Sequence, residues 1–140
     1  MALSARRRRE VYERAGGCCE YCRRAVGVRL VPFEVDHIIP LKHGGDDIGQ
    51  NLCLACEPCN RYNGANVAAI DALTDERTRL YNPRQQAWSE HFNIHPDGSL
   101  SGSTPEARAS VRVLRINDPP RIQQRHGEML LGNYPCPKNS

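Results

Sequence analysis

The chain has 140 residues, of which 19 are Lys or Arg and 16 are Asp or Glu, so its formal net charge is +3. This length accommodates one domain, or one small domain with an extension. Hydrophobic residues make up 39% and aromatic residues only 6%, which predicts a thin core of the kind that a bound metal usually stabilises. No apolar run reaches the roughly 18 residues of a membrane span, and the N-terminus lacks the apolar stretch of a secretory signal. We therefore expect a soluble, cytoplasmic protein with no membrane partner.

The first expected element is a helix over residues 5–14. Ser4 precedes it and is a suitable N-cap, because its hydroxyl can accept a hydrogen bond from the first turn. Gly16 and Gly17 follow it, and glycine adopts the left-handed conformation that ends a helix. The chain is then free to reverse into a cysteine-containing segment.

A strand, a loop and a second strand are expected next. Residues 28–35 alternate well enough for a strand, although a proline interrupts it, and Asp36 and His37 lie at its end. Glycine and aspartate residues predict a loop over residues 40–49. Residues 51–55 predict a short second strand.

A helix is expected to begin near residues 56–60. We also consider its continuation past Gly64 through residues 65–73. With this helix, the sequence predicts a first domain over residues 1–73 and a C-terminal extension over residues 74–140.

The extension is expected to pack on the first domain. Tyr81, Trp88 and Phe92 predict a segment whose aromatic side chains turn back onto that domain. Asp97-Gly98 is a strong signal for a β-hairpin.

Two helices are expected to follow this hairpin. The first covers residues 106–114, with Thr104 as its cap and a proline in its first turn. Asp118 and the two prolines after it break this helix, and a second helix is expected over residues 121–131. Residues 135–140 are expected to be a frayed tail.

Four cysteines occur as two Cys-x-x-Cys pairs, Cys19/Cys22 and Cys56/Cys59. This is the spacing of a tetrahedral structural zinc site, because a two-residue spacer lets both sulfurs of a pair reach one ion. The competing interpretation is a pair of thioredoxin-like redox sites, which does not account for the Asp-His pair between them.

The other cysteines leave the ligand set open. Cys18 or Cys53 is close enough in sequence to replace one of the four ligands, whereas Cys136 is expected to be a bystander. Seven is an odd number of cysteines, which argues against a disulfide framework. In a reducing compartment, paired cysteines indicate metal binding instead.

The complete pattern resembles the HNH endonuclease family. The matching motifs, within about residues 6–68, are Cys19-Glu20-Tyr21-Cys22, Val35-Asp36-His37-Ile38-Ile39-Pro40-Leu41, Gly44-Gly45, Asn51-Leu52 and Cys56-Glu57-Pro58-Cys59-Asn60-Arg61. The resemblance implies an α+β fold with a small ββα-metal domain, in which two antiparallel strands and a helix clasp a catalytic divalent cation. A structural zinc site and a C-terminal extension of hairpin and helices complete the expected fold.

The resemblance also implies a role for each polar residue of the site. His37 is the general base, since its ordinary pKa of about 6.5 lets it take a proton from water near neutral pH. Asp36 and Asn60 offer hard oxygen ligands for magnesium or manganese. Asn51 ties the loop that holds His37 in place, although a simple capping role is the alternative. The family commonly has histidine where this chain has Asn60, but some phage junction-resolving endonucleases also have asparagine there.

Arginine dominates the basic residues, with 17 Arg against 2 Lys. Guanidinium groups bind phosphate through forked hydrogen bonds as well as charge. The candidate nucleic-acid-binding residues are Arg6, Arg7, Arg8, Arg9 and Arg61. The competing interpretations are a solvated helix face and a codon bias that favours arginine.

The sequence therefore predicts a metal-dependent endonuclease that hydrolyses the phosphodiester bonds of duplex or branched DNA. Two alternatives stay open: a zinc-stabilised DNA-binding module with a decayed catalytic site, and an RNA-cleaving nuclease that uses the same chemistry. The sequence does not distinguish a monomer from a homodimer.

Overall fold

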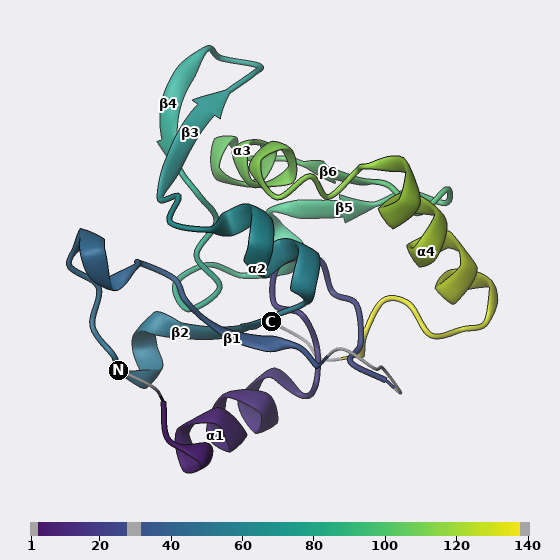
Figure 1. Cartoon of the computed structure of the whole chain (residues 1–140). Coiled ribbons are helices and arrows are strands. Elements are labelled where there is room, and N and C mark those ends of the chain that lie inside the picture. The colour runs from purple at the N-terminus through teal and green to yellow at the C-terminus, as the bar shows by residue number, and fades with distance from the viewer. Residues whose placement is uncertain (1–2, 28–31, 138–140) are drawn as a thin grey trace.

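The structure is a computed structural model of the chain, and it describes residues 3–27 and 32–137. The helices in this part of the chain are α1 (Ala5–Ala15), α2 (Glu57–Asn63), α3 (Pro105–Val113) and α4 (Pro119–Leu130) (Figure 1). The strands are β1 (Glu34–His37), β2 (Leu52–Ala55), β3 (Ala68–Asp71), β4 (Glu76–Arg79), β5 (Phe92–Ile94) and β6 (Leu100–Gly102). Short 3₁₀ helices span Leu41–His43, Gly49–Asn51 and Trp88–Glu90.

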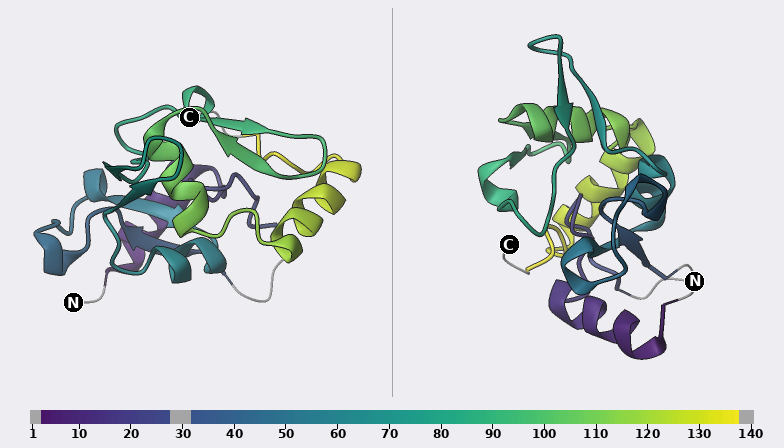
Figure 2. Two further views of the ribbon diagram at one scale, coloured as in Figure 1. Left: turned by 90° about the horizontal axis from the view of Figure 1, so that it is seen from above. Right: turned by 90° about the vertical axis from the view of Figure 1, so that its left-hand side faces the viewer.

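The ββα unit consists of β1, β2 and α2. The two strands pair antiparallel, with Asp36 opposite Cys53 and His37 opposite Leu52. α1 lies against one side of this strand pair and α2 lies on the other (Figures 1 and 2). The predicted α+β class and the strand–loop–strand–helix order are both confirmed.

The first strand is shorter than expected. Residues 28–31 of the predicted strand 28–35 lie outside the described residues, and β1 begins only at Glu34. Asp36 and His37 are therefore its last two residues. His37 occupies the point where the strand ends, so its side chain is free to meet the following loop.

The helix α1 forms as the sequence predicts. The Ser4 side chain accepts a hydrogen bond from the backbone N–H of Arg7 at 3.1 Å. Gly16, with φ of 63°, adopts the left-handed conformation that ends the helix. Val11 and Ala15 are buried, and Arg14 donates to the carbonyls of Gly49 and Leu52, so these side chains hold α1 in place.

The continuation of the second helix through residues 65–73 is wrong. α2 ends at Asn63, and the chain then forms the antiparallel pair β3–β4. The carboxylate of Asp71 accepts hydrogen bonds from Leu73 N and Thr74 Oγ1, which fold the turn of this hairpin. A short apolar run such as Val67–Ile70 does not distinguish helix from strand by periodicity, and here the local turn decides.

The hairpin and the first helix of the C-terminal half match the predictions. β5 and β6 pair around the Asp97-Gly98 turn, and the Thr104 hydroxyl caps α3 by accepting a hydrogen bond from Ala107 N at 3.3 Å. α4 differs slightly, because Pro119 and the proline after it lie in its first turn and not before it. In the first turn of a helix the backbone N–H has no partner within the helix, so proline, which lacks this N–H, is well tolerated there. The two prolines therefore belong to the helix that they were expected to precede.

The C-terminal half shares one hydrophobic core with the ββα unit. Tyr81, Trp88 and Phe92 are all buried, and the indole N–H of Trp88 donates to the carbonyl of Tyr21 at 2.9 Å. The predicted packing of these aromatic side chains is confirmed. No helix among the described residues is long and apolar enough to span a membrane.

The predicted frayed tail at residues 135–140 is wrong for its first two residues. Cys136 is buried and forms a disulfide with Cys18, while Tyr134 just before it donates its hydroxyl to the carbonyl of Cys22 at 2.7 Å. The interpretation of Cys136 as a bystander is also wrong, as is the argument from the odd number of cysteines. These contacts hold the tail, and the sequence did not predict them because the partner residues Cys18 and Cys22 are far away in the chain.

Candidate metal and catalytic site

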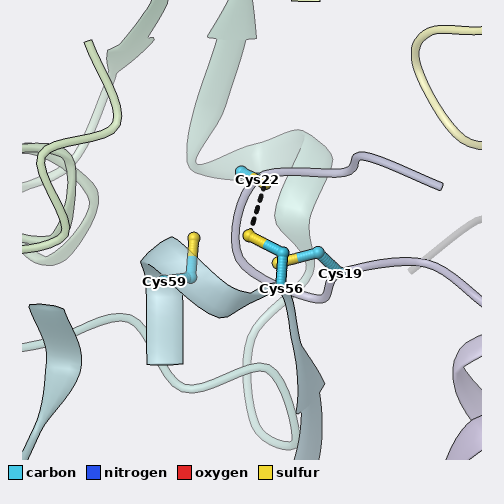
Figure 3. A group of neighbouring side chains, drawn as sticks. All are labelled: Cys19, Cys22, Cys56 and Cys59. Atoms are coloured by element: carbon cyan, nitrogen blue, oxygen red, sulfur yellow. Dashed lines mark hydrogen bonds between the residues drawn. The ribbon is translucent and has the colours of Figure 1, made fainter. Parts of the chain in front are cut away.

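Four cysteine side chains converge between the loop after α1 and the start of α2. The Sγ atoms of Cys19, Cys22, Cys56 and Cys59 all lie within 4.8 Å of one another, and all four side chains are buried (Figure 3). The Sγ atoms of Cys22 and Cys56 are 3.7 Å apart. A tetrahedral ion with metal–sulfur bonds of about 2.3 Å places its sulfurs about 3.8 Å apart, so the pocket fits a zinc-sized ion.

Burial shapes the ionisation of these thiols when no metal is bound. It raises the pKa of Cys19 and of Cys59 well above the ordinary value. Hydrogen bonds from the neighbouring thiols lower the pKa of Cys22. A metal ion therefore binds here by displacing protons from buried thiols.

Arg121 of α4 reaches the same cluster from the C-terminal half. Its Nη2 donates to Cys59 Sγ at 3.0 Å, and its Nη1 donates to the carbonyl of Leu114 at 2.6 Å. The side chain is buried; burial by itself lowers its pKa, but the negative charge of the thiolates outweighs this and raises it. Four thiolates carry more negative charge than one divalent ion neutralises, and the guanidinium offsets part of the excess.

The other two cysteines that were considered as ligands are engaged elsewhere. Cys18 is in the disulfide with Cys136, and the Cys53 thiol donates to the hydroxyl of Tyr21 at 3.3 Å. Burial raises the pKa of Cys53, which favours the thiol that makes this hydrogen bond. The cluster of four thiols includes neither of them.

Asp36 faces α2. Its residue is only 9% exposed, and its Oδ2 accepts a hydrogen bond from Asn63 Nδ2 at 2.8 Å. Burial raises the pKa of this carboxyl to about 6, and the hydrogen bond from Asn63 and the charge of His37 offset the rise only in part. A buried carboxylate whose partner is a neutral amide is suited to a cation.

His37 turns toward the loop that follows β1. Its Nε2 lies 2.9 Å from Oδ1 of Asp47, and its side chain is 22% exposed. Adjacent residues of a strand point to opposite faces, so Asp36 and His37 meet different partners. When Nε2 carries the proton and donates it to Asp47, the Nδ1 of His37 keeps a lone pair.

Asn51 closes this loop on itself. Its Oδ1 accepts from Ile39 N at 2.9 Å, and its Nδ2 donates to the carbonyls of Ile39 at 2.9 Å and Asp46 at 2.8 Å. Gly45 lies against the backbone of this loop, where a Cβ on residue 45 would overlap the carbonyl oxygen of Ile39. These bonds fix the segment that carries Asp47 beside His37.

The remaining predicted residues are less closely tied to this centre. Asn60 lies one helical turn before Asn63 on α2, and the described contacts include none from its side chain to Asp36. Arg61 pairs with Glu57 at 2.8 Å and lies over the ring of Tyr62 at 4.8 Å.

The arginine run of residues 6–9 lies on α1, across the strand pair from α2. Arg6 and Arg7 both pair with Glu10, and Arg7 also donates to the carbonyl of Asp47 at 3.3 Å. The run therefore lies near the His37 loop but not near Asn63.

Sequence reasoning missed Asp47, Asn63 and Arg121. Asn63 had a usable signal, since it follows Asn60 by three residues and so shares a face of the helix. Asp47 and Arg121 had none, because a loop conformation places the first and the packing of α4 places the second.

The family model of the HNH endonuclease matches residues 19–66. This range begins at the first metal-binding cysteine and ends just after α2. Comparison with curated proteins and with solved structures found no match to the chain. The ββα unit and its four-cysteine cluster therefore match the HNH endonuclease family model over this part of the chain.

Proposed function

We propose that this protein is a metal-dependent endonuclease that hydrolyses DNA phosphodiester bonds. The observation that carries the proposal is the end of β1, where a buried Asp36 carboxylate is followed directly by an imidazole held by Asp47. An HNH domain makes nuclease activity the general expectation. The assignment of each residue below goes beyond that expectation.

His37 acts as the general base. The hydrogen bond from its Nε2 to Asp47 fixes the ring and leaves Nδ1 to take a proton from the attacking water. The Asp47 carboxylate then stabilises the imidazolium that forms. Asn51 contributes by holding the loop, and hence Asp47, in register with the strand end.

Asp36 and Asn60 hold a catalytic magnesium or manganese ion. Carboxylate and amide oxygens are the ligands these hard cations prefer. The cation supplies charge stabilisation to the phosphate and to the leaving oxygen. Asn63 orients Asp36 by donating a hydrogen bond to its Oδ2 at 2.8 Å.

The four-cysteine cluster holds structural zinc and has no part in the chemistry. On this proposal, residues 1–73 are the nuclease domain and residues 74–140 are the extension that packs on it. The extension supplies Arg121 to the zinc cluster, so it stabilises the nuclease domain as well as covering it.

A plasmid-nicking assay tests the proposal. The zinc-loaded protein is expected to nick supercoiled plasmid when magnesium is added and to be inactive without it. His37→Ala should lower the rate about 10²–10⁴-fold, while His126→Ala, an exposed histidine on α4, should not change it. If the wild-type protein nicks no plasmid in magnesium or manganese, the nuclease proposal is wrong and a zinc-stabilised DNA-binding module is favoured. Cleavage of RNA but not of DNA would show that the substrate is RNA.

A further inference from the structure

A cavity of about 820 Å³ lies between the ββα unit and the C-terminal half. On the first side it is lined by the segment after β1, including Ile39 and His43, and by Asn63 of α2. On the second side it is lined by Arg77 and Arg79 of β4, together with side chains of the segment before α3. Neither half encloses this space by itself.

One end of the cavity reaches the proposed catalytic cation. Asn63 lines the cavity and also donates to Asp36 Oδ2 at 2.8 Å. The cavity therefore begins one side chain away from the carboxylate that would hold the ion. A molecule in this space would lie next to the reacting centre.

The other end of the cavity is bounded by the β3–β4 hairpin, which projects from the rest of the molecule (Figures 1 and 2). The turn end of this hairpin is tied to α3, because the guanidinium of Arg108 makes two hydrogen bonds of 2.9 Å to the buried carboxylate of Asp71. This ion pair holds the hairpin beside the cavity, so the residues of β4 keep their place there.

Arg77 and Arg79 are the cations that this hairpin presents. They are two residues apart on β4, about 6.6 Å at the rise of a strand, and both are exposed. Within residues 3–27 and 32–137, neither guanidinium has a hydrogen bond or ion pair. Most of the arginines discussed above, by contrast, are tied to a carboxylate, a carbonyl or a thiolate.

The rest of the lining combines apolar side chains, such as Ile38 and Leu80, with the amides of Asn66, Asn82 and Gln85. Its carboxylate, Glu106, accepts a hydrogen bond from Gln86 at 3.1 Å. Free guanidinium groups with neutral amides suit a phosphate backbone, which offers forked acceptors and negative charge.

We propose that this cavity receives the nucleic-acid strand to be cut, with Arg77 and Arg79 binding its phosphates beside the scissile bond. The proposal rests on the proposed nuclease function and adds the C-terminal half to the substrate-binding surface. The phosphate contacts predicted from the sequence are Arg61 of α2 and the run of residues 6–9 on α1, and α1 lies across the strand pair from Asn63. The hairpin arginines are instead on the side of Asn63 and Asp36.

Binding of fluorescein-labelled oligonucleotides, single-stranded and duplex, is measured by anisotropy over a range of salt concentrations without magnesium. Arg77→Ala and Arg79→Ala are each expected to lower the slope of log affinity against log salt by about 0.7 for single strands and about 0.9 for duplex DNA. Arg112→Ala, an exposed arginine of α3 that does not line the cavity, is the matched control and should keep the wild-type slope. Arg77→Lys should keep most of the slope because it keeps the charge.

The plasmid-nicking assay separates the two proposals. Wild-type slopes in both alanine variants, or an equal change in Arg112→Ala, would overturn the cavity proposal even if the protein cuts DNA. Slopes that fall as expected in a protein that cuts no nucleic acid would support the cavity and overturn the nuclease function. Circular dichroism of each variant checks that the hairpin changes leave the fold intact.

Discussion

Replacement of Arg121 by methionine is expected to weaken zinc binding as well as the fold. Arg121 is buried and makes two strong contacts, one to Cys59 Sγ at 3.0 Å and one to the Leu114 carbonyl at 2.6 Å. Methionine fills much of the same volume but donates no hydrogen bond. The variant therefore leaves both the sulfur and the carbonyl without this donor.

The size of the effect follows from those two contacts. A hydrogen bond to or from a charged group contributes about 1.5–3 kcal/mol, so the loss of two costs roughly 3–6 kcal/mol of unfolding free energy. Only the bond to Cys59 acts on the metal site directly. Its share corresponds to roughly a 10- to 100-fold loss of zinc affinity, at about 1.4 kcal/mol for each tenfold change.

The same helix provides a matched control. Arg125 is fully buried and donates to the carbonyls of Gly98 and Ile116, both at 2.7 Å, and among the described residues it makes no hydrogen bond to a cysteine sulfur. Arg125→Met should therefore lower stability about as much as Arg121→Met but change zinc affinity far less. Zinc affinity is measured by competition with a chromophoric chelator, and stability by urea unfolding. Equal zinc affinity in the two variants would show that Arg121 acts only through the fold.

Four further predictions concern the catalytic centre and the tail. Asp47→Asn should lower the nicking rate by about 10-fold or more without changing DNA affinity, because His37 loses the anion that orients and stabilises its charged form; rates and anisotropy measured on one preparation decide this. Asn60→His should stay active but shift its preference from magnesium toward nickel or cobalt, since imidazole suits softer ions; Asn60→Ala cutting at the wild-type rate in magnesium would remove it from the ligand set. Burial raises the pKa of the Asp36 carboxyl to about 6, so the folded protein favours the protonated form. The stability that this protonation contributes is complete below pH about 4 and is lost as the pH rises through 6. In magnesium-free protein, Asp36→Asn should then be more stable than wild type at pH 8, by up to about 3 kcal/mol, and equal to it at pH 4 in urea unfolding. Cys136→Ser should lower the stability of the oxidised protein by up to about 5 kcal/mol, since the bond closes a loop of 118 residues, and should change nothing under reducing conditions.

Local chemistry in the sequence was enough to predict much of this fold. The four-cysteine cluster depends on spacers of two residues, the α1 and α3 caps depend on one hydroxyl each, and the β5–β6 hairpin depends on Asp97-Gly98. Each of these features is decided by residues within a few positions of one another. For that reason a single sequence specifies them without any knowledge of the remaining chain.

The features that the sequence did not predict depend on long-range packing. Arg121 is 62 residues from Cys59, and Cys136 is 118 residues from Cys18, so no local pattern links either pair. Asp47 is only ten residues from His37, yet its position depends on how Asn51 folds the intervening loop. The β3–β4 hairpin was missed because its short apolar run fits helix and strand equally well.

The short helix α2 connects the cysteine cluster to the proposed catalytic centre. Cys59 near its start faces the four-sulfur site, and Asn63 at its end holds the carboxylate of Asp36 one turn further on. A helix of seven residues is too short to be stable alone, so its position depends on those two attachments. Loss of a metal from the cysteines would weaken one of them, and the helix would then depend more on the hydrogen bond to Asp36. A metal bound there would thus influence the placement of Asp36, and Arg121 extends that dependence to the C-terminal half.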